Sequence, residues 1–283
     1  MTALAGPVLE SSLDEAPPVR RRGRRKRGRW VLPLWSWLVI AWLCAPIIVM
    51  IIFGFNNTGG KFNIRWQGFT LRWYRQLFTI PDLTNALQNS LTIALIVTVI
   101  ATAMGTLLGM ALGRYTFRGV GSVNLLLFAN IAAPEVVLGA ALLSLFLTAG
   151  VPRGYWTIVI AQVMFSIAYV AVTVRARMGG LDPALEEAAR DLGAGSLVTF
   201  FKITLPLIMP GVLAGALLTF ALSIDDYIIT SFNAGSTVTF PLWVYGASRT
   251  GVPPQVNVMG TLIFTFGVLL AITGAVVNRR KRA

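Results

Sequence analysis

Two adjacent carboxylates, Asp225 and Asp226, interrupt an apolar segment in the stretch LSIDDYIITS, and a third, Glu135, lies in another apolar segment. A carboxylate at the centre of a membrane helix costs about 2.5–3.5 kcal/mol on insertion scales, so such residues usually face a cavity or a partner. Carboxylates can bind a cation there, and aromatic side chains such as Tyr227 and Trp243 can stack on it. These five residues are therefore candidates for the path of a positively charged solute.

Each candidate also has a structural interpretation. Neighbouring residues of a regular α-helix point about 100° apart, so Asp225 and Asp226 cannot both face one path. The alternative for one of them is to bond a partner chain or to cap an outer loop. Pro134 precedes Glu135 and indicates a kink, which would explain a polar site without any substrate. We favour Asp226 over Asp225 for the path because Tyr227 follows it directly.

The composition argues against catalytic, redox and metal chemistry. The chain has no histidine, so it lacks the commonest general base and metal ligand, and its single cysteine, Cys44, allows no intrachain disulfide. A phosphate-binding loop is also missing, because Gly59-Gly60-Lys61 is followed by Phe62 and not by a hydroxyl residue. We therefore expect no enzymatic activity, no metal site and no cofactor in this chain.

The overall composition indicates a membrane protein. Of 283 residues, 55% are hydrophobic and only 12% are charged, whereas about a quarter of the residues are charged in soluble domains. The net charge of +13 could suggest a nucleic-acid partner. Its distribution argues against one, since eight basic residues lie between Arg20 and Arg29 and four lie between Arg279 and Arg282, each cluster beside an apolar run. Such clusters are topology signals.

Six apolar stretches are each long enough to cross a bilayer as a helix of about 20 residues. They span residues 30–55, 86–112, 123–148, 156–175, 207–231 and 256–277. The predicted fold class is thus an all-α membrane protein with six transmembrane helices. We divide the chain into a disordered basic tail (1–29), a first span with an external interfacial segment (30–85), a membrane core (86–277) and a second basic tail (278–283).

An even number of spans places both termini on the same side of the membrane. With both ends cytoplasmic, 18 basic residues fall on the cytoplasmic side and 6 on the external side, as the positive-inside rule requires. The external stretch GFTLRWYRQLF places Trp73, Leu77 and Phe78 at helical spacing, with Arg72 and Arg75 between them. This pattern predicts a short helix lying on the outer surface of the bilayer.

The cytoplasmic segment between the fourth and fifth spans contains LDPALEEAARDLGAGSLVTFFKITLP. Asp182 followed by Pro183 is a good helix start, and Glu186 and Glu187 would lie near the positive end of that helix. Gly193 or Gly195 can end it in a left-handed cap. The segment therefore predicts a helix of about ten residues that is presented to the cytoplasm.

This segment resembles the EAA signature of type I ABC importer permeases. The match consists of Glu187-Ala188-Ala189, then Gly193 after three residues, and then Leu205-Pro206. In that family the helix docks into a cleft of a separate ATP-hydrolysing subunit, and is called the coupling helix. The resemblance implies that this contact involves Glu186, Glu187, Ala188, Ala189, Gly193, Leu205 and Pro206.

Further segments resemble the spermidine/putrescine permease subfamily over most of residues 30–277. They are FGFNN, WQGFTLRWYRQLF, NALQNSL, APEVVLG and LSIDDYIITSF, in that order. The resemblance implies an assembly in a bacterial inner membrane with a second homologous permease, two ATP-binding subunits that hold ATP and Mg²⁺, and an external solute-binding protein. Two alternatives remain open. One is the same importer architecture for another small organic solute, and the other is an ion-coupled secondary transporter.

Overall fold

The computed structural model of the chain describes residues 31–60 and 62–280, so the predicted N-terminal tail lies outside the described residues. The chain divides into two compact units, residues 1–48 and 49–283. The described part of the first unit belongs to helix α1 (Val31–Phe53). Large apolar side chains such as Trp35, Trp37 and Trp42 are exposed along it, as expected for a helix that contacts lipid.

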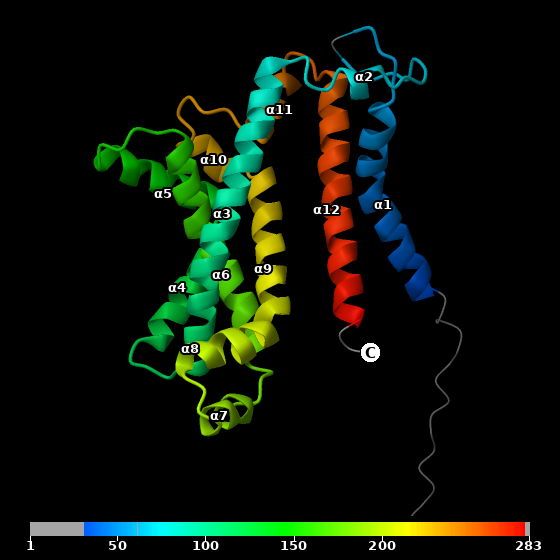
Figure 1. Ribbon diagram of the computed structural model, residues 1–283. Helices are drawn as coiled ribbons and strands as arrows, with labels where there is room; N and C mark the ends of the chain where they lie inside the picture. Colours follow the sequence, from blue (N-terminus) through cyan, green and yellow to red (C-terminus); the bar gives the residue numbers. More distant parts are fainter. Residues whose placement is uncertain (1–30, 61, 281–283) are drawn as a thin grey trace, which may run out of the picture. The chain divides into compact units, whose positions relative to one another are not determined.

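The second unit is helical apart from loops and an isolated antiparallel bridge between Asn56 and Phe69, within the part of the chain that the structure describes (Figure 1). The π-helical turn η2 lies between α8 and α9. The elements, in chain order, are α2 (Arg72–Arg75), α3 (Pro81–Arg114), α4 (Val120–Ala132), α5 (Glu135–Thr148), α6 (Tyr155–Met178), α7 (Ala184–Asp191), α8 (Ser196–Thr199), η2 (Phe200–Thr204), α9 (Leu205–Asp225), α10 (Ile228–Asn233), α11 (Phe240–Ser248) and α12 (Pro254–Arg280).

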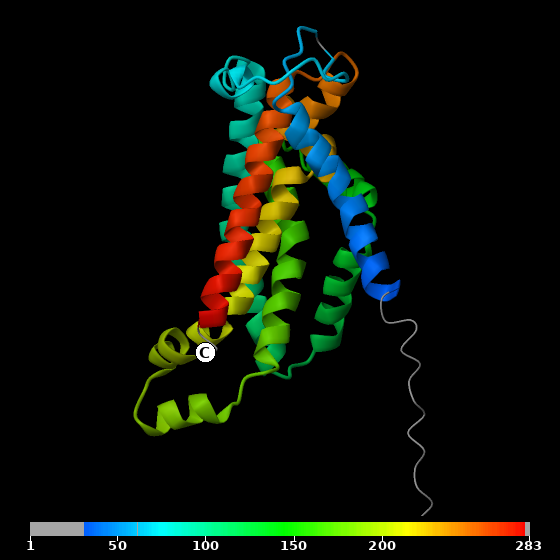
Figure 2. The ribbon, with the colours of Figure 1, turned by 90° about the vertical axis from the view of Figure 1, so that its right-hand side faces the viewer.

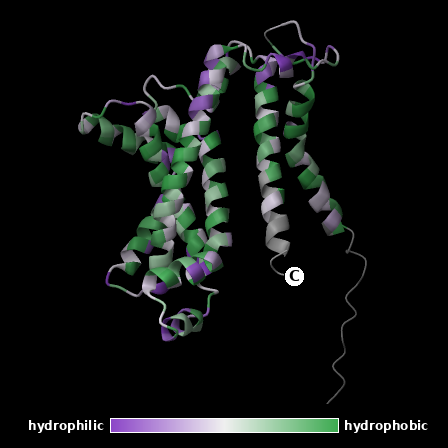
Figure 3. Cartoon of the chain, viewed as in Figure 1, coloured by the Kyte–Doolittle hydropathy of each residue, from purple (hydrophilic) through white to green (hydrophobic). Residues whose placement is uncertain are grey.

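The predicted membrane fold is confirmed. Among the described residues, five continuous helical segments are long and apolar enough to span a bilayer, and the bent pair α4 and α5 can make a sixth span. Figure 3 shows apolar residues along the long helices and more hydrophilic ones near their ends and in the loops. Helix α12 continues through Asn278 to Arg280, residues that the sequence assigned to the C-terminal tail, and 281–283 lie outside the described residues.

The third predicted span, residues 123–148, is wrong as a single helix. Helices α4 and α5 meet at an angle of 109°. Ala133 and Pro134 both have extended backbone, with ψ of 138° and 130°. A proline disfavours the helical conformation of the residue before it and donates no backbone hydrogen bond, so the helix stops there instead of kinking. Glu135 becomes the first residue of α5.

The fifth predicted span, residues 207–231, is also placed wrongly. The helical segment begins earlier, at Ser196, passes through η2 and ends at Asp225. Asp226 has an extended ψ of 116°, and its carboxylate accepts hydrogen bonds from the backbone N–H groups of Ile229 and Thr230 at the start of α10. An acidic side chain that satisfies free N–H groups in this way favours a new helix start over helix continuation.

Helices α3, α6 and α9 pack side by side and form the core of the second unit (Figure 2). Their close approach depends on glycines spaced four residues apart. A Cβ atom at Gly105 would lie only 2.5 Å from Cβ of Val170 on α6, and one at Gly109 would lie 2.6 Å from the carbonyl oxygen of Ala171. Small residues at this spacing are typical of packed membrane helices.

We expect the substitution Gly105→Leu to destabilise the chain by roughly 1–3 kcal/mol, the usual cost of overpacking a core. The measurement is thermal unfolding of the purified chain in detergent. Gly121→Leu in α4 is the matched control, because a Cβ there meets nothing within 4 Å. Equal melting temperatures for the two variants would contradict the packing role of Gly105.

The external segment differs from the predicted surface helix. Helix α2 has only four residues, and Trp73 and Leu77 pack on a cluster that includes Leu83 of α3 and Val256 of α12. The indole N–H of Trp73 donates to the backbone oxygen of Asn56 at 2.7 Å. Trp73 and Leu77 therefore face protein and not lipid, because they pack on residues near the first turns of α3 and α12.

Candidate functional site

Helix α7 forms within the predicted segment, but it runs over Ala184–Asp191, eight residues instead of about ten, with Pro183 at the N-cap position. The carboxylate of Asp182 accepts a hydrogen bond from the N–H of Ala184 at 3.0 Å. At the other end Gly193 has a φ of +81°, and the N–H of Ala194 donates to the carbonyl of Ala189 at 3.0 Å. This left-handed closure suits glycine because it has no Cβ. The two ends of α7 are therefore set by residues close in the sequence.

The predicted coupling residues divide between an inner and an outer face. Glu186 and Ala189 are buried, whereas Glu187, Ala188 and Gly193 are exposed. Leu205 is half-buried and Pro206 is exposed at the start of α9. The outer face also carries large apolar side chains: Leu192 is 90% exposed and Leu185 is exposed beside it. Exposed leucines on a short charged helix are typical of a surface that binds a partner.

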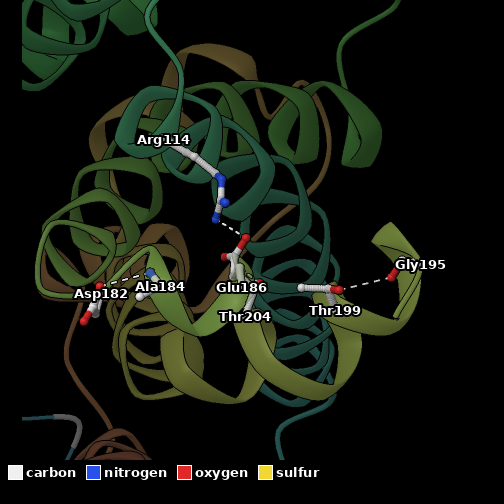
Figure 4. A network of polar contacts seen from close by, with 7 residues as sticks. All are labelled: Arg114, Asp182, Ala184, Glu186, Gly195, Thr199 and Thr204. Carbon is white, nitrogen blue, oxygen red and sulfur yellow. Dashed lines mark hydrogen bonds and ion pairs between the residues drawn. The ribbon is translucent and has the colours of Figure 1, made fainter. Parts of the chain in front are cut away.

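The inner face of α7 holds a polar network that the sequence did not predict (Figure 4). The Glu186 carboxylate forms an ion pair with Nη1 of Arg114, the last residue of α3. Its other oxygen accepts a hydrogen bond of 2.8 Å from the hydroxyl of Thr204 in η2. Glu186 is only 8% exposed, so it binds within this chain.

At the other end of α9, a cavity of about 1000 Å³ lies between α9, α11 and α12. Asp225 is the one charged residue among the described residues that line it, and two tyrosines join it there. The lining residues are Leu217, Leu218, Phe220, Ala221, Ile224, Asp225, Tyr227, Phe240, Pro241, Val244, Tyr245, Ser248, Gly260, Ile263, Phe264, Gly267 and Val268. A largely apolar cavity with few polar groups is the usual form of a binding site for a small organic molecule.

The tyrosines form a cluster at this cavity. The rings of Tyr227 and Tyr245 are 4.7 Å apart, centroid to centroid. Arg249 donates a hydrogen bond of 2.9 Å to the hydroxyl of Tyr245 and its guanidinium lies over the same ring. That hydrogen bond lowers the pKa of the Tyr245 hydroxyl below its ordinary value. The sequence analysis did not predict that Tyr245 and Arg249 belong to this site, because Tyr245 and Tyr227 lie in separate segments.

Asp226 has a different environment from Asp225. Its carboxylate accepts hydrogen bonds from the amide of Gln162 on α6 at 3.2 Å and from the backbone N–H of Thr230 at 2.8 Å. The hydroxyl of Ser223 donates in turn to the Gln162 side-chain oxygen. These contacts join α9, α6 and α10, so the geometry favours Asp225 over Asp226 for a path. The sequence analysis missed this network. Gln162 could have indicated it, because it is a glutamine within a predicted apolar span.

The two remaining candidates lie outside the cavity lining. Glu135 is exposed at the start of α5, and it lies, like Asp226, within electrostatic reach of Asp225. Trp243 packs on the cluster around Leu77 and Val256. The structure therefore places Trp243 in the packing around Leu77 and Val256, and leaves Glu135 outside the residues that line the cavity.

The arrangement suits the binding of a small molecule. Among the described residues, no group of three or more histidine, cysteine or acidic side chains could hold a metal ion. Asp225 can pair with a positive charge, and the ring of Tyr227 can attract one, while the apolar walls suit a carbon chain. The cavity can thus take an organic cation.

Comparisons with known proteins agree with this architecture. Residues 101–283 match the family described as "Binding-protein-dependent transport system inner membrane component". The chain is 38% identical over 260 residues to the spermidine/putrescine transport system permease protein PotC of Escherichia coli (strain K12), covering 92% of this chain and 96% of that protein. It is 40% identical over 234 residues to the putrescine transport system permease protein PotI of the same strain, covering 80% and 83%.

A solved structure shows the same fold. A chain from the crystal structure of a bacterial ABC transporter involved in the import of the acidic polysaccharide alginate aligns with a TM-score of 0.66 at 15% identity. The alignment covers 90% of this chain and 96% of that one. The similarity supports the fold alone, since the sequences have diverged widely.

Proposed function

The chain belongs to the family of binding-protein-dependent transport system inner membrane components, and on that premise we propose that it is the permease subunit of an ATP-driven ABC importer for polyamines. The observation that carries the proposal is the 38% identity to a spermidine/putrescine permease over 92% of this chain. Asp225 at the wall of a largely apolar cavity supports it, because a polyamine carries positive charges along a carbon chain.

The proposed assembly contains a second homologous permease, two ATP-binding subunits and an external solute-binding protein. The ATP-binding subunits hold ATP and Mg²⁺, and this chain catalyses no reaction itself. The outer face of α7, with Glu187, Ala188 and Gly193 exposed, is the surface on which an ATP-binding subunit docks. This orientation makes the α7 side cytoplasmic, together with both termini of the multi-pass chain, in a bacterial inner membrane.

Transport in this proposal follows alternating access. ATP binding closes the two ATP-binding subunits on each other, and α7 moves with the subunit on which it docks. The permease pair then opens toward the binding protein, which releases its solute. Asp225 replaces part of the water around one ammonium group, and Tyr227 offers an aromatic face to the cation. The ring of Tyr245 is already covered by Tyr227 and by the Arg249 guanidinium, so it holds Tyr227 in place. Glu135 adds negative charge near this point and Asp226 holds the local fold.

Two alternatives predict different properties. An importer for another organic solute would keep the docking face of α7 and would not need Asp225. An ion-coupled secondary transporter could use the carboxylates within the apolar segments for protons, but it would not need an exposed segment that carries Leu185 and Leu192 at its surface. The importer for polyamines accounts for both features.

The substrate is tested by ATP hydrolysis in vesicles that carry the whole assembly. We expect the binding protein loaded with spermidine or putrescine to stimulate hydrolysis, because a partner that binds the outward-open state more tightly shifts the assembly toward that state. The same binding protein without a polyamine is the control. Stimulation by a sugar-loaded binding protein, with none by a polyamine-loaded one, would contradict the polyamine assignment.

A further inference from the structure

Glu186 lies at the meeting point of three segments that are far apart in the sequence. It belongs to α7, its ion-pair partner Arg114 ends α3, and its hydrogen-bond partner Thr204 lies in η2 (Figure 4). The side chains of Arg114 and Glu186 are 24% and 11% exposed. This contact is therefore shielded from water and separate from the outer face that carries Glu187.

The chemistry of this contact favours one fixed arrangement. A carboxylate with so little exposure is costly unless it is paired and hydrogen-bonded. Here both oxygens are used, one by the guanidinium of Arg114 and the other by the hydroxyl of Thr204. If α7 shifted alone by a few ångströms, both contacts would break together. The low-energy way for α7 to move is to carry the ends of α3 and η2 with it.

The position of Thr204 indicates that this movement would pass into α9. Thr204 is the last residue of the π-helical turn η2, which leads directly into α9. π-Helical turns bring an extra residue into a helix and often occur at functional sites. Helix α9 has 21 residues, about 31 Å at 1.5 Å per residue, and it ends at Asp225. The polar network thus lies at one end of a helix whose other end reaches the cavity.

We propose that Glu186 is a positioning residue that fastens α7 to the inner ends of α3 and α9, so that a displacement of α7 is transmitted along α9 to Asp225. The inference rests on the proposed function, because it takes the displacement to come from an ATP-binding subunit. It assigns Glu186 a role inside this chain, distinct from the docking role of its neighbour Glu187.

The first test compares variants that remove one contact each. Glu186→Gln removes the charge, and Thr204→Val removes the hydroxyl while nearly keeping the side-chain shape. Thr204→Ser is the matched control because it keeps the hydroxyl. In vesicles with the whole assembly, we expect Glu186→Gln and Thr204→Val to take up at least about fivefold less polyamine per ATP hydrolysed, the lower end of usual coupling between sites. Thr204→Ser should keep the wild-type ratio.

The second test measures directly whether α7 is held against the end of α3. Cys44 is the only cysteine, so a Cys44→Ala background allows spin labels at two exposed positions. They are Arg190 on α7, which is not among the residues assigned to the docking face, and Phe117 beyond α3. In the assembly we expect a narrow distance distribution between the labels for the wild type and for Thr204→Ser. The distribution should broaden in Glu186→Gln and Thr204→Val, because α7 is then free to move against α3.

The ratio of uptake to ATP hydrolysis and the distances between the labels together test the proposal. A wild-type ratio of uptake to hydrolysis in both Glu186→Gln and Thr204→Val would overturn it, and so would unchanged distances in both. Because Thr204→Val removes a single hydrogen bond, it tests the role even if Glu186→Gln fails to fold. If the wild-type assembly takes up no polyamine, the proposed function fails, whereas the distance distributions still report whether Glu186 fastens α7.

Discussion

Replacing Asp225 with asparagine is expected to lower polyamine uptake by about tenfold or more without unfolding the protein. Hydrogen bonds to charged groups contribute about 1.5–3 kcal/mol, and each 1.4 kcal/mol corresponds to about tenfold in affinity. Asp225 is exposed at the wall of an open cavity, so water weakens its pairing and the lower end of that range applies. The measurement is the initial rate of labelled spermidine uptake into vesicles with the whole assembly, with thermal unfolding measured in parallel.

Asp226→Asn is the matched control because it makes the same chemical change one residue away. Its expected effect is on stability, since the Asp226 carboxylate accepts hydrogen bonds from Gln162 and Thr230. A buried donor left without a partner costs about 1–3 kcal/mol. If Asp225→Asn left uptake unchanged while Asp226→Asn abolished it in a stable protein, the assignment of Asp225 to the path would be wrong.

Glu187→Lys is expected to abolish most of the uptake while leaving the fold of this chain intact. Glu187 is exposed on α7, so reversing its charge removes no contact that fixes the helix. On the proposed docking surface the same change would place an unmatched charge in a closed interface, at a cost of roughly 2–5 kcal/mol, or about thirtyfold or more in binding. The measurement is ATP hydrolysis and uptake by the assembly, together with the amount of ATP-binding subunit that copurifies.

Two further variants show whether the loss arises at the docking surface. Ser196→Lys adds a positive charge on the neighbouring helix α8 and should have a small effect. Gly193→Leu should act like Glu187→Lys, because the added side chain meets nothing within 4 Å inside this chain and projects outward. Its backbone φ of +81° adds about 1–2 kcal/mol of strain. Normal assembly and uptake in both Glu187→Lys and Gly193→Leu would exclude this face as the docking surface.

Features fixed by local chemistry were predictable from the sequence. The side chain of Asp182 caps the start of α7, and Gly193 closes the turn after its end, as expected from capping and from the freedom of glycine. The long apolar runs gave the spans, because a bilayer requires about 20 apolar residues. The EAA resemblance placed Glu187, Ala188 and Gly193 together, and the structure leaves all three exposed.

Features that depend on distant residues were not predictable. The sequence gives no sign that Arg114 pairs with Glu186, since the two are brought together only when α3 packs on α6 and α9. The helix end at Asp226 depends on Gln162 and Thr230, which make a capped break more favourable than a continuous helix. The preference for Asp226 over Asp225 rested on Tyr227, which follows Asp226 directly, whereas the cavity lining contains Tyr227 together with Asp225 and without Asp226.

The most direct test of the account is the uptake of labelled spermidine into vesicles, with and without ATP inside the compartment that the ATP-binding subunits face. The account predicts uptake only when this chain is present with its partner permease, both ATP-binding subunits, the loaded binding protein and ATP. Uptake by this chain alone, driven by an ion gradient and independent of ATP, would contradict it.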